Sequence, residues 1–239
     1  MKERLPVISV VDDDTAARSS LRLLLKSLGL AATAYDSAAE FLASYDPQQP
    51  GCLLLDIRMP GMSGLELQEE LNRRGTILPV IFITGHADVP MAVEAMQHGA
   101  FDFVQKPFRD QELLDRVQRA IAKDRLIRDQ LRCQDSIRQR LESLTPREHD
   151  VLDLVTTGAP NKIVAYKLGI SPRTVEIHRA RVMEKMNADS LAQLVHMTLD
   201  VGARSETKDA SAEDPYENTA ISMPWMAHSR HEERAKLIT

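Results

Sequence analysis

Short apolar runs alternate with amphipathic stretches along the first 120 or so residues of the chain. The run Leu53-Leu54-Leu55 has no polar interruption, which is typical of a strand buried on both faces of a sheet. Similar runs predict strands over residues 7–11, 32–35, 78–84 and 101–105. Helical patterns separate these runs, and right-handed crossovers would place the helices on both faces. The sequence therefore predicts an α/β doubly wound, five-stranded parallel sheet.

Capping residues mark several of the intervening helices. Gly29 is expected to end the first helix, and Ser37 with Glu40 three residues later has the form of a capping box. A further helix is predicted over 90–98, and Asp110 is expected to cap the last helix of this half.

Polar residues lie at the carboxyl ends of four of the predicted strands. Asp12 and Asp13 follow the first strand, Asp56 the third and Lys106 the fifth, while Thr84 ends the fourth. The carboxyl ends of parallel strands meet at one edge of a sheet, where ligands bind. Clustered carboxylates favour Mg²⁺, and a Lys can pair with an incoming anion, so the set suits phosphoryl transfer to Asp56. Asp56 alone, before a Pro-Gly turn, would be an ordinary turn residue.

The second half of the chain is predicted to be helical. Residues 121–143 are polar with irregularly spaced apolar positions, which favours a solvated connecting helix over a short coiled coil. Thr145 is the expected N-cap of the next helix, with Glu148 as its N3 partner. Helices are then predicted over 161–168, 172–186 and 189–199, and Ser171 is expected to cap the second of these three. A short turn before a capped basic helix is the helix-turn-helix pattern, within an all-α four-helix domain. A generic four-helix bundle with a solvated basic face is the alternative.

Composition narrows these expectations. The hydrophobic share of 43% is sufficient for packed cores, and no apolar run approaches the length of a membrane helix, so we expect a cytoplasmic protein with no membrane partner. Cys52 and Cys133 are expected to be unpaired thiols. The net charge of −5 does not exclude nucleic acid, because Arg173, Arg179, Arg181 and Lys185 are clustered. Residues 203–222 are polar, and 203–239 as a whole are expected to be a disordered tail.

The first half resembles a known family. The segments concerned are Val10-Val11-Asp12-Asp13, Leu53-Leu54-Leu55-Asp56, Ile83-Thr84-Gly85-His86 and Lys106-Pro107, and they resemble two-component receiver domains in order and spacing. The resemblance covers about residues 5–122 and implies that Asp56 is the phosphoacceptor. It also implies that Asp13 and Asp56 hold Mg²⁺ directly, Asp12 through water, and Arg58 through its backbone carbonyl.

Further features of the receiver family are implied by the same match. Thr84 and Phe103 correspond to the family's switch pair, and the Lys106–Pro107 bond to its cis peptide. Asp14 is extra, and we expect it to be an acid favoured at a helix N-terminus.

The second half resembles LuxR-type output domains. The matching segments are 144–148, 161–165 and 170–179, and the whole chain resembles the FixJ subgroup of transcriptional response regulators. The resemblance implies that the helix near 172–186 enters the major groove. The residues then expected on base edges are Arg173, Glu176, Ile177, Ala180 and Arg181, and those expected on phosphates are Lys162, Thr174, Arg179 and Lys185.

The predicted organisation is a receiver domain over 1–122, a linker helix over 123–143, an output domain over 144–202 and a tail over 203–239. The resemblance implies a phosphorylation-controlled transcriptional regulator that is not an enzyme beyond slow self-dephosphorylation. Its expected partners are a sensor histidine kinase, double-stranded promoter DNA and RNA polymerase, with a homodimer when phosphorylated.

Two other functions use parts of the same residue set. Aspartate-based, Mg²⁺-dependent phosphatases share the nucleophile, the Thr and the Lys, but they need a second acid two residues after the nucleophile. Arg58 occupies that position, which argues against turnover. A binding module that is never phosphorylated would not need the complete set of acids.

Overall fold

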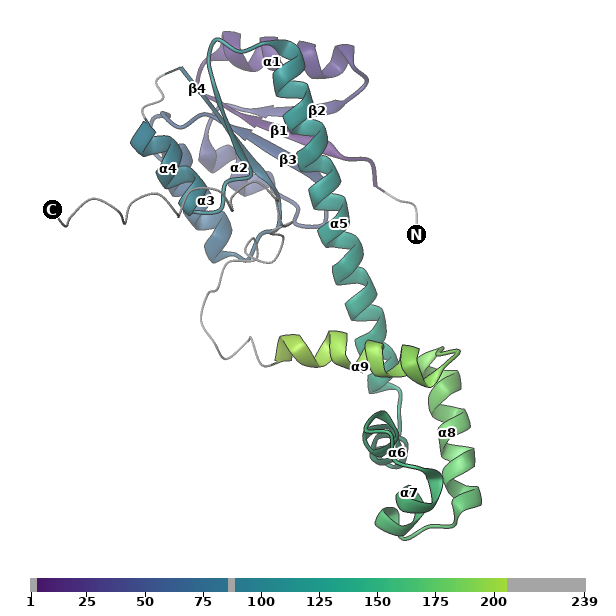
Figure 1. The fold of residues 1–239 in the computed structure, drawn as a ribbon. Coiled ribbons are helices and arrows are strands. Elements are labelled where there is room, and N and C mark those ends of the chain that lie inside the picture. The colour runs from purple at the N-terminus through teal and green to yellow at the C-terminus, as the bar shows by residue number, and fades with distance from the viewer. Residues whose placement is uncertain (1–3, 86–88, 206–239) are drawn as a thin grey trace, which may run out of the picture. The chain divides into compact units, whose positions relative to one another are not determined.

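The first half of the chain folds around one parallel sheet. The computed structural model describes residues 4–85 and 89–205 (Figure 1). Five strands pair in the order β2-β1-β3-β4-β5, which confirms the predicted sheet. Their bounds are β1 Val7–Val11, β2 Ala31–Tyr35, β3 Gly51–Leu55, β4 Val80–Thr84 and β5 Asp102–Gln105.

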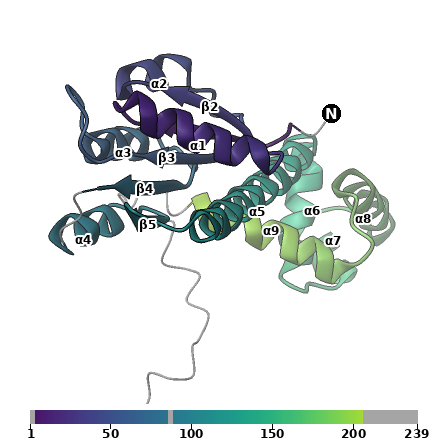
Figure 2. The same ribbon diagram turned by 90° about the horizontal axis from the view of Figure 1, so that it is seen from above.

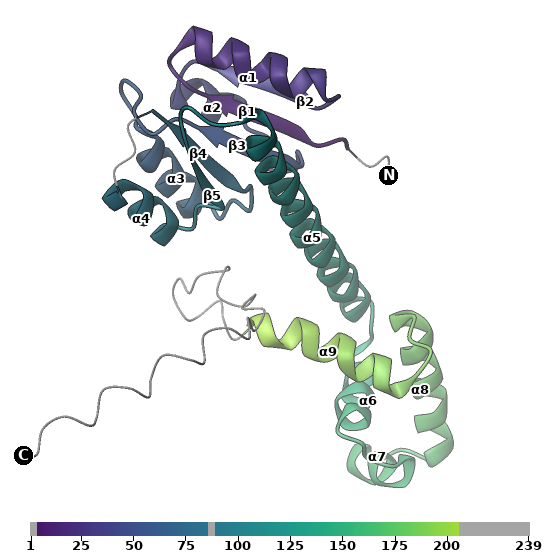
Figure 3. The same cartoon turned by 45° about the horizontal axis from the view of Figure 1, so that its top comes forward.

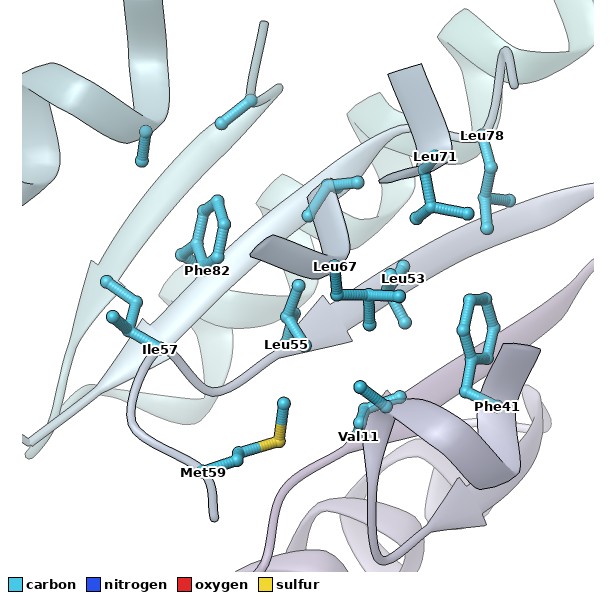
Figure 4. Close-up of a cluster of buried hydrophobic side chains, with 14 residues drawn as sticks. Val11, Phe41, Leu53, Leu55, Ile57, Met59, Leu67, Leu71, Leu78 and Phe82 are labelled. Carbon is cyan, nitrogen blue, oxygen red and sulfur yellow. The ribbon is translucent and has the colours of Figure 1, made fainter. Parts of the chain in front are cut away.

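Helices cover both faces of this sheet (Figure 2). One face packs against α1 (Thr15–Ser27) and the first part of α5 (Asp110–Glu142). The other packs against α2 (Ala38–Ser44), α3 (Gly64–Arg73) and α4 (Val89–Gln97). Figure 4 shows part of this cluster, with labelled side chains from α2, α3 and the strands. This is the two-sided arrangement that right-handed crossovers require.

The central strand β3 explains why both faces hold together. All five of its residues are buried, and successive side chains point to opposite faces. Leu53 and Leu55 join the cluster beneath α2 and α3, whereas Cys52 and Leu54 join the one beneath α1 and α5. At its start, a Cβ on Gly51 would lie 1.8 Å from the carbonyl oxygen of Val7, so only glycine lets β1 approach this closely.

The helix α5 is longer than the sequence pattern indicates. The predicted last receiver helix and the linker helix form one continuous helix of 33 residues. None of residues 125–136 is buried, in agreement with a solvated connecting helix. Ile137 is buried again, because the helix there meets a second core.

A buried ion pair fastens α5 to the loop before β3. Asp124 is fully buried, and its Oδ2 accepts the backbone N–H of Gly51 at 2.9 Å. Arg128 donates from Nε to both carboxylate oxygens of Asp124 at 2.9 Å. Its Nη1 and Nη2 reach the carbonyl oxygens of Pro47 and Gln49 at 2.8 and 3.1 Å. Two residues of α5 thus satisfy three backbone groups of a loop far away in sequence.

Two predicted caps differ from the structure. Asp110 is the first residue of α5, and the N-cap is Arg109, which makes no side-chain cap hydrogen bond. Ser37 does cap α2 by accepting from the N–H of Glu40. The Glu40 carboxylate, however, accepts the N–H of Asp36 and leaves the capping box incomplete. α5 therefore begins one residue earlier than predicted, whereas α2 begins where predicted and only the bond to the Glu40 carboxylate is displaced, by one residue to Asp36.

The second half is a bundle of helices (Figure 3). Its elements are α6 Pro146–Thr156, α7 Asn161–Leu168, α8 Pro172–Met186 and α9 Leu191–Ser205. The capping box of Thr145 with Glu148 and the cap of Ser171 on α8 are confirmed. The fourth helix was predicted over 189–199 but begins two residues later and continues to Ser205.

The core of this bundle includes the end of α5. Ile137 and Leu141 pack with Leu152, Val182 and Leu194. The helical unit therefore takes residues from before the predicted boundary at 144. Arg140 supports the same junction, because its Nη1 donates to the carbonyl oxygen of Met186 at the end of α8, 3.0 Å away.

The described residues bear on two further predictions, the absence of a membrane-spanning helix and the tail. No helix in the described part of the chain is both long and apolar enough to cross a membrane. The predicted tail over 203–239 is wrong at its first three residues, because α9 continues to Ser205, and the rest, from residue 206 onward, lies outside the described residues.

Candidate functional site

The predicted polar residues meet at the carboxyl edge of the sheet. Asp12 follows β1, Asp56 follows β3 and Thr84 ends β4. Lys106 directly follows β5, which ends at Gln105. These four strands are neighbours in the sheet and run parallel, so their carboxyl ends share one edge. Asp12, Asp56 and Thr84 are buried, at 3%, 9% and 2% exposure.

Lys106 connects the two buried carboxylates. Its Nζ lies 2.8 Å from Asp12 Oδ2 and 3.4 Å from Asp56 Oδ1. Burial by itself would lower the pKa of Lys106, but the hydrogen bonds and charges of Asp12 and Asp56 outweigh it, so the pKa is raised. The ammonium group therefore stays charged between the two acids. The Lys106–Pro107 peptide that precedes the next helix is cis, as predicted.

Asp56 is held in a fixed orientation. Its Oδ2 accepts the N–H of Arg58 at 2.8 Å, while Oδ1 faces Lys106. Burial raises the pKa of Asp56, the Lys106 charge and the Arg58 hydrogen bond oppose that rise, and the Asp12 charge adds to it. A Cβ on Gly64 would lie 2.2 Å from the carbonyl oxygen of Asp56, so only glycine allows α3 to begin this close to the site.

Both carboxylate oxygens of Asp12 already have partners. Oδ2 pairs with Lys106, and Oδ1 accepts the N–H of Asp14 at 2.8 Å. This leaves Asp12 better placed to contact a metal through water than directly. Asp13, by contrast, is exposed. Asp14 is the N-cap of α1 and accepts the N–H of Ala16, which assigns it a structural role.

The donor set fits Mg²⁺. Within residues 4–85 and 89–205, no group of three or more His, Cys, Asp or Glu side chains is spaced to hold a metal ion. Mg²⁺ does not require such a group, because it keeps several waters and binds through one or two carboxylates. The predicted ligands Asp13, Asp56 and the Arg58 carbonyl would be hard oxygen donors of that kind, and Lys106 lies 3.4 Å from Asp56 Oδ1.

The predicted switch residues lie near each other in the sheet. Thr84 ends β4, and Phe103 lies on the adjacent strand β5, opposite Phe82. Phe103 is half-buried and packs against the cluster that α2, α3 and α4 cover. A movement of either side chain remains a prediction.

The outward face of α8 is the second candidate surface. Val175, Val182 and Met186 are buried and form the inner face of the helix. The five residues predicted to contact bases are all exposed, namely Arg173, Glu176, Ile177, Ala180 and Arg181. The surface is therefore free to meet a groove.

The residues predicted to contact phosphates divide into two groups. Lys162 is exposed near the start of α7, and Thr174 lies in the first turn of α8. Arg179 instead donates to Asn161 Oδ1 at 2.7 Å. Lys185 is 2.7 Å from the carboxylate of Glu148 and also donates to the carbonyl oxygen of Ser143 at 3.0 Å.

Glu148 was missed as the partner of Lys185. The hydrogen bond from Lys185, with those from Thr145, lowers the pKa of Glu148 to about 2. A carboxyl group with a lowered pKa stabilises the fold above its unfolded pKa and loses that contribution as the pH falls toward 2. The sequence marks Glu148 only as a capping residue, because its second partner lies 37 positions away.

Comparisons with known proteins match both parts of the chain that carry these candidate surfaces. A family model described as the response regulator receiver domain matches residues 8–118, and one described as bacterial regulatory proteins, luxR family, matches residues 142–198. The transcriptional regulatory protein FixJ of Azorhizobium caulinodans is 50% identical over 202 residues, which cover 84% of this chain and 95% of that protein. The chain belongs to the FixJ-type response regulators.

Other members are similar to this response regulator over most of its length. Nodulation protein W of Bradyrhizobium diazoefficiens is 49% identical over 196 residues, covering 82% of this chain and 86% of that protein. Among solved structures, the response regulator StyR is similar with a TM-score of 0.77 and 46% identity, covering 82% of this chain and 98% of that one. This response regulator thus combines a receiver domain with a LuxR-type DNA-binding domain.

Proposed function

We propose that this response regulator accepts a phosphoryl group on Asp56 from a sensor histidine kinase and then binds promoter DNA as a homodimer. The observation that carries the proposal is the convergence of Asp56, Asp12 and Lys106 at one edge of the sheet, in a chain that also exposes a basic helix-turn-helix face. RNA polymerase is the proposed further partner and the cytoplasm the proposed location.

The residues of the site have separate roles in the proposed transfer. A carboxylate oxygen of Asp56 forms a bond to phosphorus as the bond between phosphorus and the kinase histidine nitrogen breaks. Lys106 pairs with an oxygen of the incoming group, and the Thr84 hydroxyl donates a hydrogen bond to it. Mg²⁺, held by Asp13, Asp56 and the Arg58 carbonyl with Asp12 through water, would neutralise the phosphoryl oxygens.

A phosphatase function gains no support from the site. Turnover needs a general acid or base near the nucleophile. The residue two positions after Asp56 is Arg58, whose guanidinium group lies 3.9 Å from the sulfur of Met91. A permanently charged guanidinium cannot take up or release a proton at this position.

We propose that the phosphorylated dimer forms through α4 and β5. Val93 and Met96 on α4 are each 48% exposed, so this helix offers apolar side chains to a second copy. Phosphorylation can favour the dimer only if it stabilises the conformation with complementary contacts. With acetyl phosphate and Mg²⁺, sedimentation is expected to show a doubled mass. A mass that stays monomeric over a wide concentration range would count against this mode of activation.

Arg181→Ala is expected to weaken binding to cognate DNA and to relax the preference at one base pair. Arg181 is exposed on the outer face of α8, and arginine can pair bidentately with guanine at a cost on removal of about 1–3 kcal/mol. Lys162→Ala is the matched comparison, because a phosphate contact should weaken all sequences alike and lower the salt slope by about one. Titrations of cognate and scrambled duplexes at several salt concentrations separate the two.

An equal loss of affinity for both duplexes would remove the base-reading role of Arg181. Lys185 is not part of the proposed contact set, because its ammonium group holds the buried carboxylate of Glu148. Arg179 is also not part of this set, because its guanidinium group donates to Asn161 and thereby holds the start of α7.

A further inference from the structure

Arg18 reaches from the second turn of α1 back to the end of β1. Its Nη1 donates to the carbonyl oxygen of Asp12 at 2.6 Å, and its Nη2 donates to Thr15 Oγ1 at 3.0 Å. The backbone N–H of Arg18 donates to the carbonyl oxygen of Asp14 at 3.0 Å. The half-buried side chain therefore contacts Asp12 and Thr15, one on each side of Asp13, while the backbone bond would form with any residue at position 18.

These contacts fix the peptide groups on both sides of Asp13. The carbonyl of the peptide before Asp13 accepts from Arg18. The N–H of the peptide after it, which belongs to Asp14, donates to Asp12 Oδ1 at 2.8 Å. The direction of the Cα–Cβ bond follows from the two flanking peptides, so these contacts fix where the exposed side chain of Asp13 leaves the backbone.

We propose that Arg18 is a positioning residue for Asp13 and thereby sets the Mg²⁺ affinity of the phosphorylation site. The role rests on the proposed function, in which Asp13 is a direct metal ligand. Groups that orient a ligand from behind commonly change metal affinity by about 10–100-fold when they are removed. The guanidinium plane suits this task, because two of its nitrogens hold the Asp12 carbonyl and the Thr15 hydroxyl at once.

Charge and position predict opposite effects for the loss of Arg18. A cation beside a metal site repels Mg²⁺, so if its charge were the main influence, removal of Arg18 would tighten binding. If its hydrogen bonds to the loop are the main influence, removal lets Asp13 turn away and weakens binding. The sign of the change in affinity therefore decides between the two effects.

The test is calorimetric titration of the full-length protein with Mg²⁺ in the absence of a phosphodonor. Arg18→Ala is expected to weaken Mg²⁺ binding by about tenfold, at the lower end of the range for such groups. Arg18→Lys should restore part of the affinity, since one ammonium can reach the carbonyl but not both acceptors. The matched control is Arg22→Ala, which removes the same charge from an exposed position one turn along α1 and should leave the affinity unchanged.

A kinetic measurement separates positioning from a general loss of stability. With acetyl phosphate, Arg18→Ala should raise the Mg²⁺ concentration that gives half-maximal labelling while leaving the rate at saturating Mg²⁺ close to that of the wild type. Unchanged or tighter Mg²⁺ binding by Arg18→Ala would overturn the proposal. Should that variant not fold, Arg18→Lys decides, because affinity equal to the wild type would overturn it equally.

Comparing Mg²⁺ binding by the wild type and by Asp13→Ala distinguishes a failure of this proposal from a failure of the proposed function on which it rests. Mg²⁺ binding by the wild type that is lost in Asp13→Ala supports the assigned site. Binding that survives in Asp13→Ala would overturn the ligand role of Asp13, and with it the role of Arg18.

Discussion

Asp56→Asn is expected to abolish phosphorylation of the purified protein by acetyl phosphate in the presence of Mg²⁺. The substitution keeps the shape of the side chain and removes the charge and nucleophilicity of the carboxylate. Incorporation of labelled phosphate, followed over time, is the measurement.

Asp36→Asn is the matched control for this substitution. Asp36 also follows a strand of the same sheet, β2, but it is exposed and lies on the edge strand away from Lys106. Its replacement should leave labelling unchanged. If Asp56→Asn were labelled as well as the wild type, another residue would have to be the phosphoacceptor.

Asp124→Ala is expected to lower the free energy of unfolding of the receiver by about 3–5 kcal/mol, the usual cost of breaking a buried ion pair. The change leaves the Nε of Arg128 and the N–H of Gly51 without the carboxylate that now accepts from both. Urea denaturation of the full-length protein measures the loss.

The control for Asp124 lies on the same helix. Asp129 pairs with Arg125 and Arg132 on the exposed part of α5, and exposed pairs contribute about 0–1 kcal/mol. Asp129→Ala should therefore have little effect. A loss below about 1 kcal/mol for Asp124→Ala would mean that water or another group replaces the lost acceptor.

The strand ends of the receiver were the most predictable part of the molecule. Apolar runs locate β1, β3, β4 and β5, and parallel pairing alone brings the residues after them to one edge. Asp56 and Lys106 could be recognised for this reason, and the resemblance to receiver domains added their roles. The outward stripe of α8 could be predicted in the same way, because helical spacing separates buried Val175 from exposed Arg181.

Contacts between residues far apart in sequence could not be predicted. Asp124 and Lys185 look like ordinary surface charges in polar helices, yet each meets a group that its own helix does not contain. The apolar spacing between 121 and 143 is irregular because α5 packs against the sheet first and against the helical core only from Ile137. No single helical period describes a helix that changes partner along its length.

The two cysteines give this protein an internal measure of how often the receiver sheet opens. Burial, with the charge of Asp124 adding to it, raises the pKa of the Cys52 thiol to about 12, whereas Cys133 is exposed on α5. Only a thiolate attacks a disulfide reagent, so in the folded protein Cys133 should react and Cys52 should not. In a Cys133→Ser background, the slow appearance of the Cys52 adduct would count openings of β3 under native conditions, without denaturant.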